Sequence, residues 1–385
     1  MRFPNFEKPW DKTYLSKYLT VSSLRNKNNT YTRNDVLSVS GELGIVNQIE
    51  LLGRSYAGES LLPYHIVEKD DVVYTKSPLA EYPYGIIKTN RIVPGIVSTL
   101  YAVYKSTTSS NNRFVEHYFS LKSRTNNYLK PIVRIGAKHD MKIGNEEVLK
   151  NYVVFPAVEE QTKIADFLDL IDERITTQSK IIEDLELVKK GIYNHIFTQL
   201  NSVEKVLLED LLIDFNKRTL TDKQYPILSS TLSGIYLQED YFNKQAASAS
   251  TEGYKIVPYG FATYRSMSDT GEFRFNLQTI VENGIVSPAY PVFTCIENYR
   301  LDFILFCLNY YDDIKKQLFS MKQGGTRLAL HFNSLCKLYI PQIDKEKQSK
   351  IMAIVNSYDA KIVVEKQILE KLKEQKKFLL SNMFI

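Results

Sequence analysis

The chain repeats one pattern of residues twice, and this duplication limits its possible folds more than any other feature. Short segments of the first half recur in the same order in the second half, at a separation far longer than a solenoid repeat. The 385 residues are therefore predicted to hold two similar domains, each large enough for its own core. The matched pairs are Leu37-Ser-Val-Ser with Leu228-Ser-Ser-Thr, Tyr74 with Tyr264, Gly95-Ile-Val-Ser with Gly284-Ile-Val-Ser, and Gln161-Thr-Lys-Ile with Gln348-Ser-Lys-Ile.

Each copy has the same order of predicted elements. Short runs of β-branched and aromatic residues predict strands, and one helical stretch follows them, at 113–128 and at 301–321. Each copy then closes on a proline, Pro156 or Pro341, after which a long helical pattern begins. The predicted organisation is a first domain at 1–155, a first long helix at 156–200, a second domain at 201–340 and a second long helix at 341–385.

Both long helical segments carry a heptad pattern of apolar residues. In 164–196, and again in 351–383, eight of the ten seam positions are apolar or aromatic. A seam sustained over so many heptads is typical of a coiled coil rather than of a surface helix. The predicted fold class is α+β, with two similar mixed α/β domains separated by a long antiparallel two-helix coiled coil.

The polar exceptions in the two seams fall at equivalent places, Gln178 with Glu365 and Lys189 with Lys376. In an antiparallel pair, Gln178 could lie opposite Lys376 and Lys189 opposite Glu365, and these contacts would fix the register. The alternative is that all four side chains extend to solvent along the apolar surface. The sequence leaves both interpretations open.

Each copy contains one basic stretch without any Asp or Glu, at 117–139 and at 314–343, and each stretch includes a glycine-bearing loop. Lys and Arg contact phosphates, and Arg also reads base edges, so these stretches predict DNA contacts. The alternative is an ordinary solvated surface. The candidates are Lys122, Arg124, Lys130, Arg134, Lys138 and His139 in the first copy, and Lys322, Arg327 and His331 in the second.

A second candidate surface for DNA follows the matched tyrosines Tyr74 and Tyr264. Basic residues lie next to these tyrosines or close behind them in the sequence, but the signal is weaker than that of the acid-free stretches. The candidates are Lys76 and Arg91 in the first copy and Arg265 and Arg274 in the second.

Composition and missing motifs argue against several classes of protein. The formal net charge is +5, and basic side chains are in excess mainly in the first domain, which favours a polyanionic partner there. The three cysteines are widely spaced and fit neither a disulfide framework nor a zinc site, as expected in a reducing cytoplasm. No phosphate-binding loop or dinucleotide-binding fingerprint occurs, and no Pro-Pro pair of an amino-methyltransferase motif. We therefore expect no catalytic and no metal-binding residue.

Three segments together resemble the specificity subunits of type I restriction-modification systems. They are the opening Arg2-Phe-Pro-Asn-Phe-Glu-Lys-Pro-Trp, the repeated Gly-Ile-Val-Ser, and the junction Phe155-Pro-Ala-Val-Glu-Glu-Gln-Thr-Lys-Ile-Ala. The resemblance covers essentially the whole chain. The second junction, Pro341-Gln-Ile-Asp-Lys-Glu-Lys-Gln, departs from it because it is two residues longer and lacks the Glu-Glu-Gln run.

The resemblance implies a non-catalytic DNA-recognition subunit. In this family each target-recognition domain reads one half of a bipartite site in double-stranded DNA, and the helical spacer sets the gap. Two modification subunits use S-adenosylmethionine to methylate adenine in each half, and restriction subunits with ATP and Mg²⁺ may join them. Two other interpretations of the residues stay open: a single-chain DNA methyltransferase or nuclease with unrecognised motifs, and a scaffold that only bridges proteins.

Overall fold

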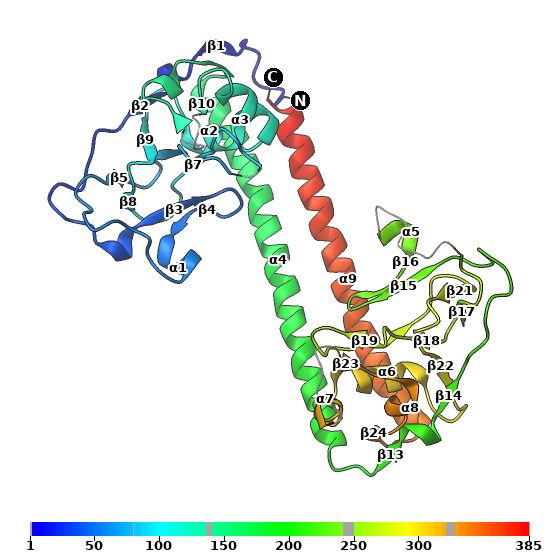
Figure 1. The fold of residues 1–385 in the computed structure, drawn as a ribbon. Helices are drawn as coiled ribbons and strands as arrows, with labels where there is room; N and C mark the ends of the chain where they lie inside the picture. The colour runs from blue at the N-terminus through cyan, green and yellow to red at the C-terminus, as the bar shows by residue number, and fades with distance from the viewer. Residues whose placement is uncertain (1, 80, 136–140, 242–249, 321–327, 385) are drawn as a thin grey trace. The chain divides into compact units, whose positions relative to one another are not determined.

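The computed structural model describes residues 2–79, 81–135, 141–241, 250–320 and 328–384 (Figure 1). Contacts between residues divide the chain into two compact units, each of which is described by itself. Unit 1 comprises residues 1–180 and 366–385, and unit 2 comprises residues 181–365. None of the described helices is long and apolar enough to cross a lipid bilayer.

Unit 1 is built around a four-stranded antiparallel sheet in the order β2-β9-β6-β7, and four strand pairs surround it. The pairs are β1-β12, β3-β4, β5-β8 and β10-β11. The strands are β1 (Asp11–Tyr14), β2 (Leu19–Val21), β3 (Leu37–Ser40), β4 (Gly44–Asn47), β5 (His65–Val67), β6 (Val72–Thr75), β7 (Ile87–Thr89), β8 (Gly95–Val97), β9 (Tyr101–Ser106), β10 (Arg134–Ile135), β11 (Met141–Lys142) and β12 (Tyr152–Phe155). The short helices are α1 (Gln48–Leu52), α2 (Asn112–Tyr118) and α3 (Lys122–Leu129).

Unit 2 repeats this plan with a four-stranded sheet in the order β14-β22-β18-β20. The strand pairs are β13-β24, β15-β16, β17-β21 and β19-β23. The strands are β13 (Lys205–Leu207), β14 (Leu212–Asp214), β15 (Leu228–Thr231), β16 (Gly234–Leu237), β17 (Lys255–Pro258), β18 (Ala262–Thr263), β19 (Met267–Ser268), β20 (Asn276–Leu277), β21 (Asn283–Val286), β22 (Val292–Cys295), β23 (Leu328–Ala329) and β24 (Tyr339–Pro341). The short helices are α5 (Gln238–Tyr241), α6 (Leu301–Tyr310), α7 (Asp312–Ser320) and α8 (Phe332–Leu335).

The helical stretch expected in each domain is in fact two helices. The stretch at 113–128 divides into α2 and α3, and the stretch at 301–321 divides into α6 and α7. After α6 the backbone of Tyr311 becomes extended, and two acidic residues then begin the first turn of α7. Negative charge is favourable at a helix N-terminus, so this sequence starts a new helix rather than continuing the old one.

The two long helices are α4 (Val158–Leu200) and α9 (Lys345–Asn382). In unit 1 the first part of α4 packs with the last part of α9, because Ile164, Leu168 and Leu379 belong to one buried cluster with the sheet (Figure 1). In unit 2 the last part of α4 packs with the first part of α9 through Phe197 and Ile351. The helices are thus antiparallel in each unit. The prediction of two similar mixed α/β domains with a pair of long antiparallel helices is confirmed.

The repeated Gly-Ile-Val-Ser begins β8 in unit 1 and lies within β21 in unit 2, where a side chain on the glycine would collide with a neighbour. A Cβ atom on Gly95 would lie 2.5 Å from the carbonyl oxygen of Asp35, and a Cβ atom on Gly284 would meet the buried side chain of Leu228. We expect Gly95→Ala and Gly284→Ala each to lower the stability of their unit by about 1–3 kcal/mol through overpacking. Urea denaturation of the purified variants measures the loss.

Gly191 provides the matched control for these substitutions. It lies within α4, and a Cβ atom added there would meet nothing within 4 Å. Because glycine costs about 1 kcal/mol relative to alanine inside a helix, Gly191→Ala should raise stability by that amount. A loss at Gly191 equal to that at Gly95 would contradict the steric explanation.

Candidate nucleic-acid interface

A buried glutamine ties each long helix to its domain, and the two glutamines are equivalent in the repeat. Gln161 accepts a hydrogen bond from the backbone N–H of Asn111 (2.9 Å) and donates to the carbonyl oxygens of Ser109 (3.0 Å) and Pro156 (2.9 Å). The side chain is completely buried. Asn111 caps α2, so the glutamine fixes the start of α2 against the start of α4.

Gln348 makes the corresponding contacts in unit 2. It accepts from the backbone N–H of Arg300 (2.8 Å), the residue before α6, and donates to the carbonyl oxygen of Ile343 (2.8 Å). It is also completely buried. The repeat in the sequence pairs Gln161 with Gln348 but does not reveal their role, because the backbone amide that each glutamine binds is distant in sequence.

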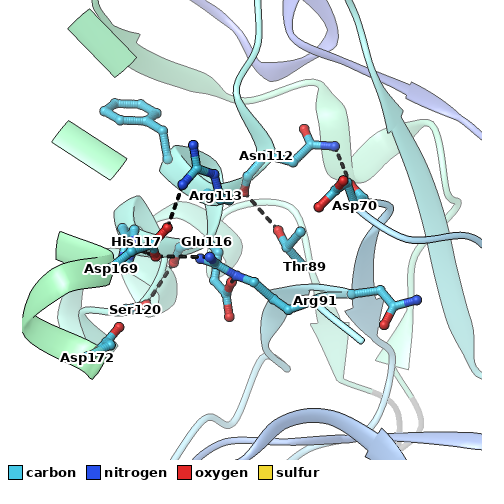
Figure 2. Close-up of polar contacts among 12 residues, drawn as sticks. Asp70, Thr89, Arg91, Asn112, Arg113, Glu116, His117, Ser120, Asp169 and Asp172 are labelled. Carbon is cyan, nitrogen blue, oxygen red and sulfur yellow. Dashed lines mark hydrogen bonds and ion pairs between the residues drawn. The ribbon is translucent and has the colours of Figure 1, made fainter. Parts of the chain in front are cut away.

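In unit 1 two arginines and a histidine surround Asp169 on α4, as Figure 2 shows. Its carboxylate accepts from Arg91 Nη1 (2.9 Å), from Arg113 Nη1 (2.8 Å) and from the buried His117 Nε2 (2.8 Å). Arg91 also binds Glu116 (2.7 Å). We call these four residues around Asp169 the Asp169 network. It links the segment after β7, α2 and α4, so it holds the domain on the helix.

The charges of this network control the ionisation of Asp169. Burial by itself would raise the pKa of the carboxyl group, but the hydrogen bond from His117 and the positive charges of Arg91 and Arg113 outweigh it. The pKa of Asp169 is therefore held well below its ordinary value. The carboxylate is ionised at neutral pH and neutralised by its neighbours.

Unit 2 has no counterpart of the Asp169 network among its described residues. The positions that match Asp169 and His117 in the repeat are Asn356 and Phe306. Phe306 instead contacts two aromatic rings of α4, at 4.8 Å from Tyr193 and 4.8 Å from Phe197 between ring centroids. At this place the first domain contacts its helix through charges and the second through aromatic packing.

His117, Asp169 and Asp172 form the one cluster of potential metal ligands found among the described residues. However, arginine nitrogens already occupy both oxygens of Asp169, and Lys376 pairs with Asp172. A divalent cation would have to displace several cationic side chains. The cluster is therefore interpreted as an ion-pair network that joins the domain to α4 and α9.

Several residues predicted to touch DNA are engaged in contacts within unit 1. Arg91 belongs to the Asp169 network. Arg124 donates to the carbonyl oxygens of Tyr118 and Leu380 (both 3.1 Å) and lies 4.8 Å from the ring centre of Phe384, so it anchors the end of α9. Burial lowers the pKa of its guanidinium.

Two further residues that were predicted to contact DNA each have one polar partner for the side chain. Lys76 donates to the Asn145 side chain at 2.5 Å, and Lys122 pairs with the exposed Glu81 at 3.4 Å. Burial, with help from the nearby Arg25, lowers the pKa of Lys76. An exposed ion pair such as that of Lys122 is worth little and breaks easily, which leaves Lys122 available to a ligand.

Lys130 and Arg134 are exposed, and neither has a polar partner within the described ranges. Arg134 lies opposite Lys142 in the β10-β11 pair, which concentrates positive charge on this strand pair. Lys138 and His139, also predicted to contact DNA, lie outside the described residues. Lys142 was not among the predicted DNA contacts, because it follows Asp140 and so falls beyond the acid-free stretch.

In unit 2 the structure brings Arg265 and Arg274 to one concavity of about 650 Å³. Arg265 is exposed, whereas Arg274 donates to the Tyr310 hydroxyl at 2.7 Å and lies over its ring. His331 is exposed and precedes α8. Lys322 and Arg327 lie outside the described residues, so the acid-free stretch of this unit is only partly described.

The lysines of the two heptad seams each pair with an aspartate. In unit 1 Lys376 contacts Asp172, and in unit 2 Lys189 contacts Asp359. Each aspartate precedes the partner that the register hypothesis gave to the lysine, Gln178 or Glu365, by six positions. The two ion pairs are equivalent in the repeat, since both residues of one match both residues of the other. The contacts with Gln178 and Glu365 stay a prediction.

The fold is similar to solved structures over its whole length, although no family model matches the sequence. The S subunit of the type I restriction-modification system from M. genitalium superposes with a TM-score of 0.58 at 13% sequence identity, covering 100% of this chain and 97% of that chain. A structure described as the basis of complex assembly and conformational transition of the type I R-M system gives a TM-score of 0.55 at 14% identity, with 98% of each chain covered. This chain therefore has the fold of the specificity subunits of type I restriction-modification systems.

Proposed function

We propose that the chain is the DNA-specificity subunit of a type I restriction-modification complex. Each unit would read one half of a bipartite site in double-stranded DNA, and the paired helices would set the gap between the halves. The observation that carries the proposal is the duplication, because two similar domains share one anchoring glutamine, Gln161 or Gln348, on one of two antiparallel helices. A pseudo-symmetric reader of this kind suits a site with two separate halves.

The partners proposed for this chain are two modification subunits, with restriction subunits as further partners. The helices offer a surface for such docking. In unit 1 an apolar groove of about 560 Å³ lies between α4 and α9, lined by Phe167, Leu170, Ile368 and Leu372. The side chain of Leu170 is 58% exposed. Its exposure to water is unfavourable, and a helix of a partner subunit would remove that exposure on binding. S-adenosylmethionine would be bound by the modification subunits, and ATP and Mg²⁺ by the restriction subunits.

The competing proposal is a single-chain DNA methyltransferase or nuclease. It is less favoured because the titratable groups that converge in unit 1 neutralise one another in the Asp169 network, and none is left to act on a substrate. Incubating the purified chain with labelled S-adenosylmethionine, or with Mg²⁺ and plasmid, separates the two proposals. Methyl transfer or cleavage by the chain alone would support the enzyme.

Mapping methylated adenines across the genome, with and without the gene for this chain, tests the proposed function. We expect one class of split site, with adenines methylated in both halves, to disappear when the gene is deleted. Restoring the gene should restore both halves together. Loss of methylation in only one half, or no change, would contradict a two-domain reader.

Removing Lys130 and Arg134, two exposed basic residues of unit 1, should weaken DNA binding without unfolding the domain. Each lysine or arginine that contacts a phosphate contributes nearly one unit to the slope of log affinity against log salt concentration. We expect Lys130→Ala with Arg134→Ala to reduce this slope by about 2 in the complex with the modification subunits. Fluorescence anisotropy with duplex DNA at several salt concentrations measures it.

Arg124 is the control for this prediction. Because its guanidinium holds the end of α9, Arg124→Ala should reduce the stability of unit 1 by roughly 1–3 kcal/mol and leave the salt slope unchanged. A decrease in the salt slope for Arg124→Ala, with none for the double variant, would show that Arg124 contacts a phosphate and that Lys130 and Arg134 do not.

A further inference from the structure

The concavity of unit 2 has two walls. The first wall is β15 with the turn that follows it, including Ser229 and Thr231, and the second is formed by residues between Arg265 and Arg274. Hydroxyl groups of Ser268 and Thr270 add donors and acceptors to the second wall. The concavity of about 650 Å³ thus presents polar groups beside apolar ones, and β15 belongs to a two-stranded ribbon, an element that fits the major groove of DNA.

Arg265 differs from the other described arginines of unit 2, because each of these already has a polar partner. Arg218 donates to the carbonyl oxygen of Gly253, Arg274 to Tyr310, and Arg300 binds Asp302. Arg265 is exposed and has no hydrogen-bond, ion-pair or ring partner in the part of the chain that the structure describes. Its guanidinium therefore keeps all its donors for a ligand.

The backbone that carries Arg265 is held firmly on both sides. The buried Tyr264 donates its hydroxyl to the carbonyl oxygen of Leu330 (3.1 Å). The buried Ser266 donates to the carbonyl oxygen of Ala289 (2.8 Å) and accepts from the N–H of Leu330 (2.8 Å). A rigid support reduces the entropy lost when a long side chain is fixed on its target.

The charges around Arg265 favour a base edge over a phosphate as its ligand. Arg265 and Arg274 line the concavity together with the exposed acid Glu272 and the neutral hydroxyls of Ser268 and Thr270, so the lining is not uniformly basic. Phosphate sites rely on an excess of positive charge, which this mixed lining reduces. A base pair presents donors and acceptors without net charge, so the mixed lining suits it.

We propose that Arg265 is a specificity-determining residue that recognises a guanine in the half-site bound by unit 2. The two parallel N–H groups of the guanidinium match the O6 and N7 acceptors of guanine, which is the commonest specific contact of arginine with DNA. This proposal rests on the proposed DNA-recognition function and deepens it, since it assigns one base of the site to one side chain.

The first domain lacks this feature at the matching position. Tyr74 matches Tyr264 in the repeat, so Thr75 stands where unit 2 has Arg265. Thr75 is buried, and its hydroxyl accepts from the N–H of Ile86 (3.1 Å). The duplicated scaffold thus carries different side chains at one place, and only one of the two half-sites should depend on arginine there.

The test compares Arg265→Ala and Arg265→Lys with the unaltered chain, each in a complete complex with its modification subunits. Adenine methylation is mapped on a plasmid library in which every position of the bipartite site is randomised. We expect both variants to lose the requirement for guanine at one position of one half-site, with discrimination against the other bases falling by about 10-fold or more. The other half-site should keep its specificity.

The lysine variant separates a base contact from a phosphate contact. Lysine keeps the charge but not the planar fork of arginine, so a phosphate contact would survive and Arg265→Lys would behave like the unaltered chain. That result, or a uniform loss over all positions, or unchanged specificity in Arg265→Ala, would overturn the proposal. If the unaltered complex methylated no bipartite site at all, the proposed function itself would fail instead.

Discussion

Replacing Asp169 by asparagine should lower the stability of unit 1 by about 3 kcal/mol, because it removes the negative centre of an ion-pair network. Three cationic or hydrogen-donating side chains converge on this carboxylate, and its own side chain is only 20% exposed. Asparagine offers one acceptor oxygen, and its amide N–H₂ would face an arginine. Arg91 and Arg113 would each keep one other carboxylate partner, Glu116 or Asp166, but would lose the shared one while staying partly buried.

Asp166 supplies the matched control on the same helix. It also binds Arg113, at 2.8 Å, but its side chain is 53% exposed. Exposed ion pairs contribute at most about 1 kcal/mol, so Asp166→Asn should have little effect. Hydrogen exchange assigns the loss to α2 and α4, and urea denaturation gives its size. Equal effects of the two substitutions would show that the network does not hold the domain.

The pH dependence of the Asp169 contribution has a definite sign. Its pKa is lower in the folded chain than in the unfolded chain, so the unfolded state binds a proton more readily as pH falls. The stabilisation is fully present above the ordinary pKa of aspartate, about 3.9, and decreases as pH falls toward the lowered value. The part of the difference between Asp169→Asn and the unaltered chain that comes from ionisation of this carboxyl should therefore be constant near neutral pH and should shrink only in acid.

The duplication and the heptad pattern made the fold predictable to a large extent. Both signals depend on residues close in sequence or on a regular period, and both are independent of the exact tertiary contacts. The matched Gly95 and Gly284 could be paired from the sequence, although the close approach of a neighbouring segment that excludes a side chain at each is seen only in the fold. The division of each helical stretch into two helices was missed, because apolar periodicity continues across the break.

The roles of single charged residues were much less predictable. Arg91 and Arg124 are of a residue type that commonly contacts DNA, but their partners, Asp169 and Leu380, lie 78 and 256 positions away in the chain. Sequence alone does not reveal whether a cation meets a phosphate or a distant carboxylate. The exposure and the partners of each side chain in the fold do reveal it, and they leave Lys122, Lys130, Arg134 and Arg265 as cations available to DNA.

The aspartate partners of the two seam lysines were not predicted, because a heptad pattern specifies which face of a helix is buried and not which residues meet. Sliding one helix along the other keeps the apolar seam nearly intact. Long lysine side chains also reach beyond the seam, so Lys376 and Lys189 contact aspartates next to it. The ion pairs consequently follow flanking acids, which the seam analysis did not include.

Replacing the anchoring glutamines by alanine should be as costly as disrupting the Asp169 network. Gln161→Ala removes three hydrogen bonds and leaves the N–H of Asn111 and the carbonyls of Ser109 and Pro156 without partners at a buried site. Each orphaned buried group costs about 1–3 kcal/mol, so we expect a loss of about 3–5 kcal/mol in unit 1. Gln348→Ala breaks two such bonds and should cost unit 2 about 2–4 kcal/mol.

The exposed glutamines Gln199 on α4 and Gln367 on α9 are the matched controls, and their alanine variants should change stability by less than about 0.5 kcal/mol. Hydrogen exchange should localise the loss of Gln161→Ala to α2 and that of Gln348→Ala to α6, because each glutamine binds the amide at the start of that helix. If both domains lost protection in either variant, the units would not be independently anchored. If neither did, the repeated glutamine would have another reason to occupy the same place in both copies.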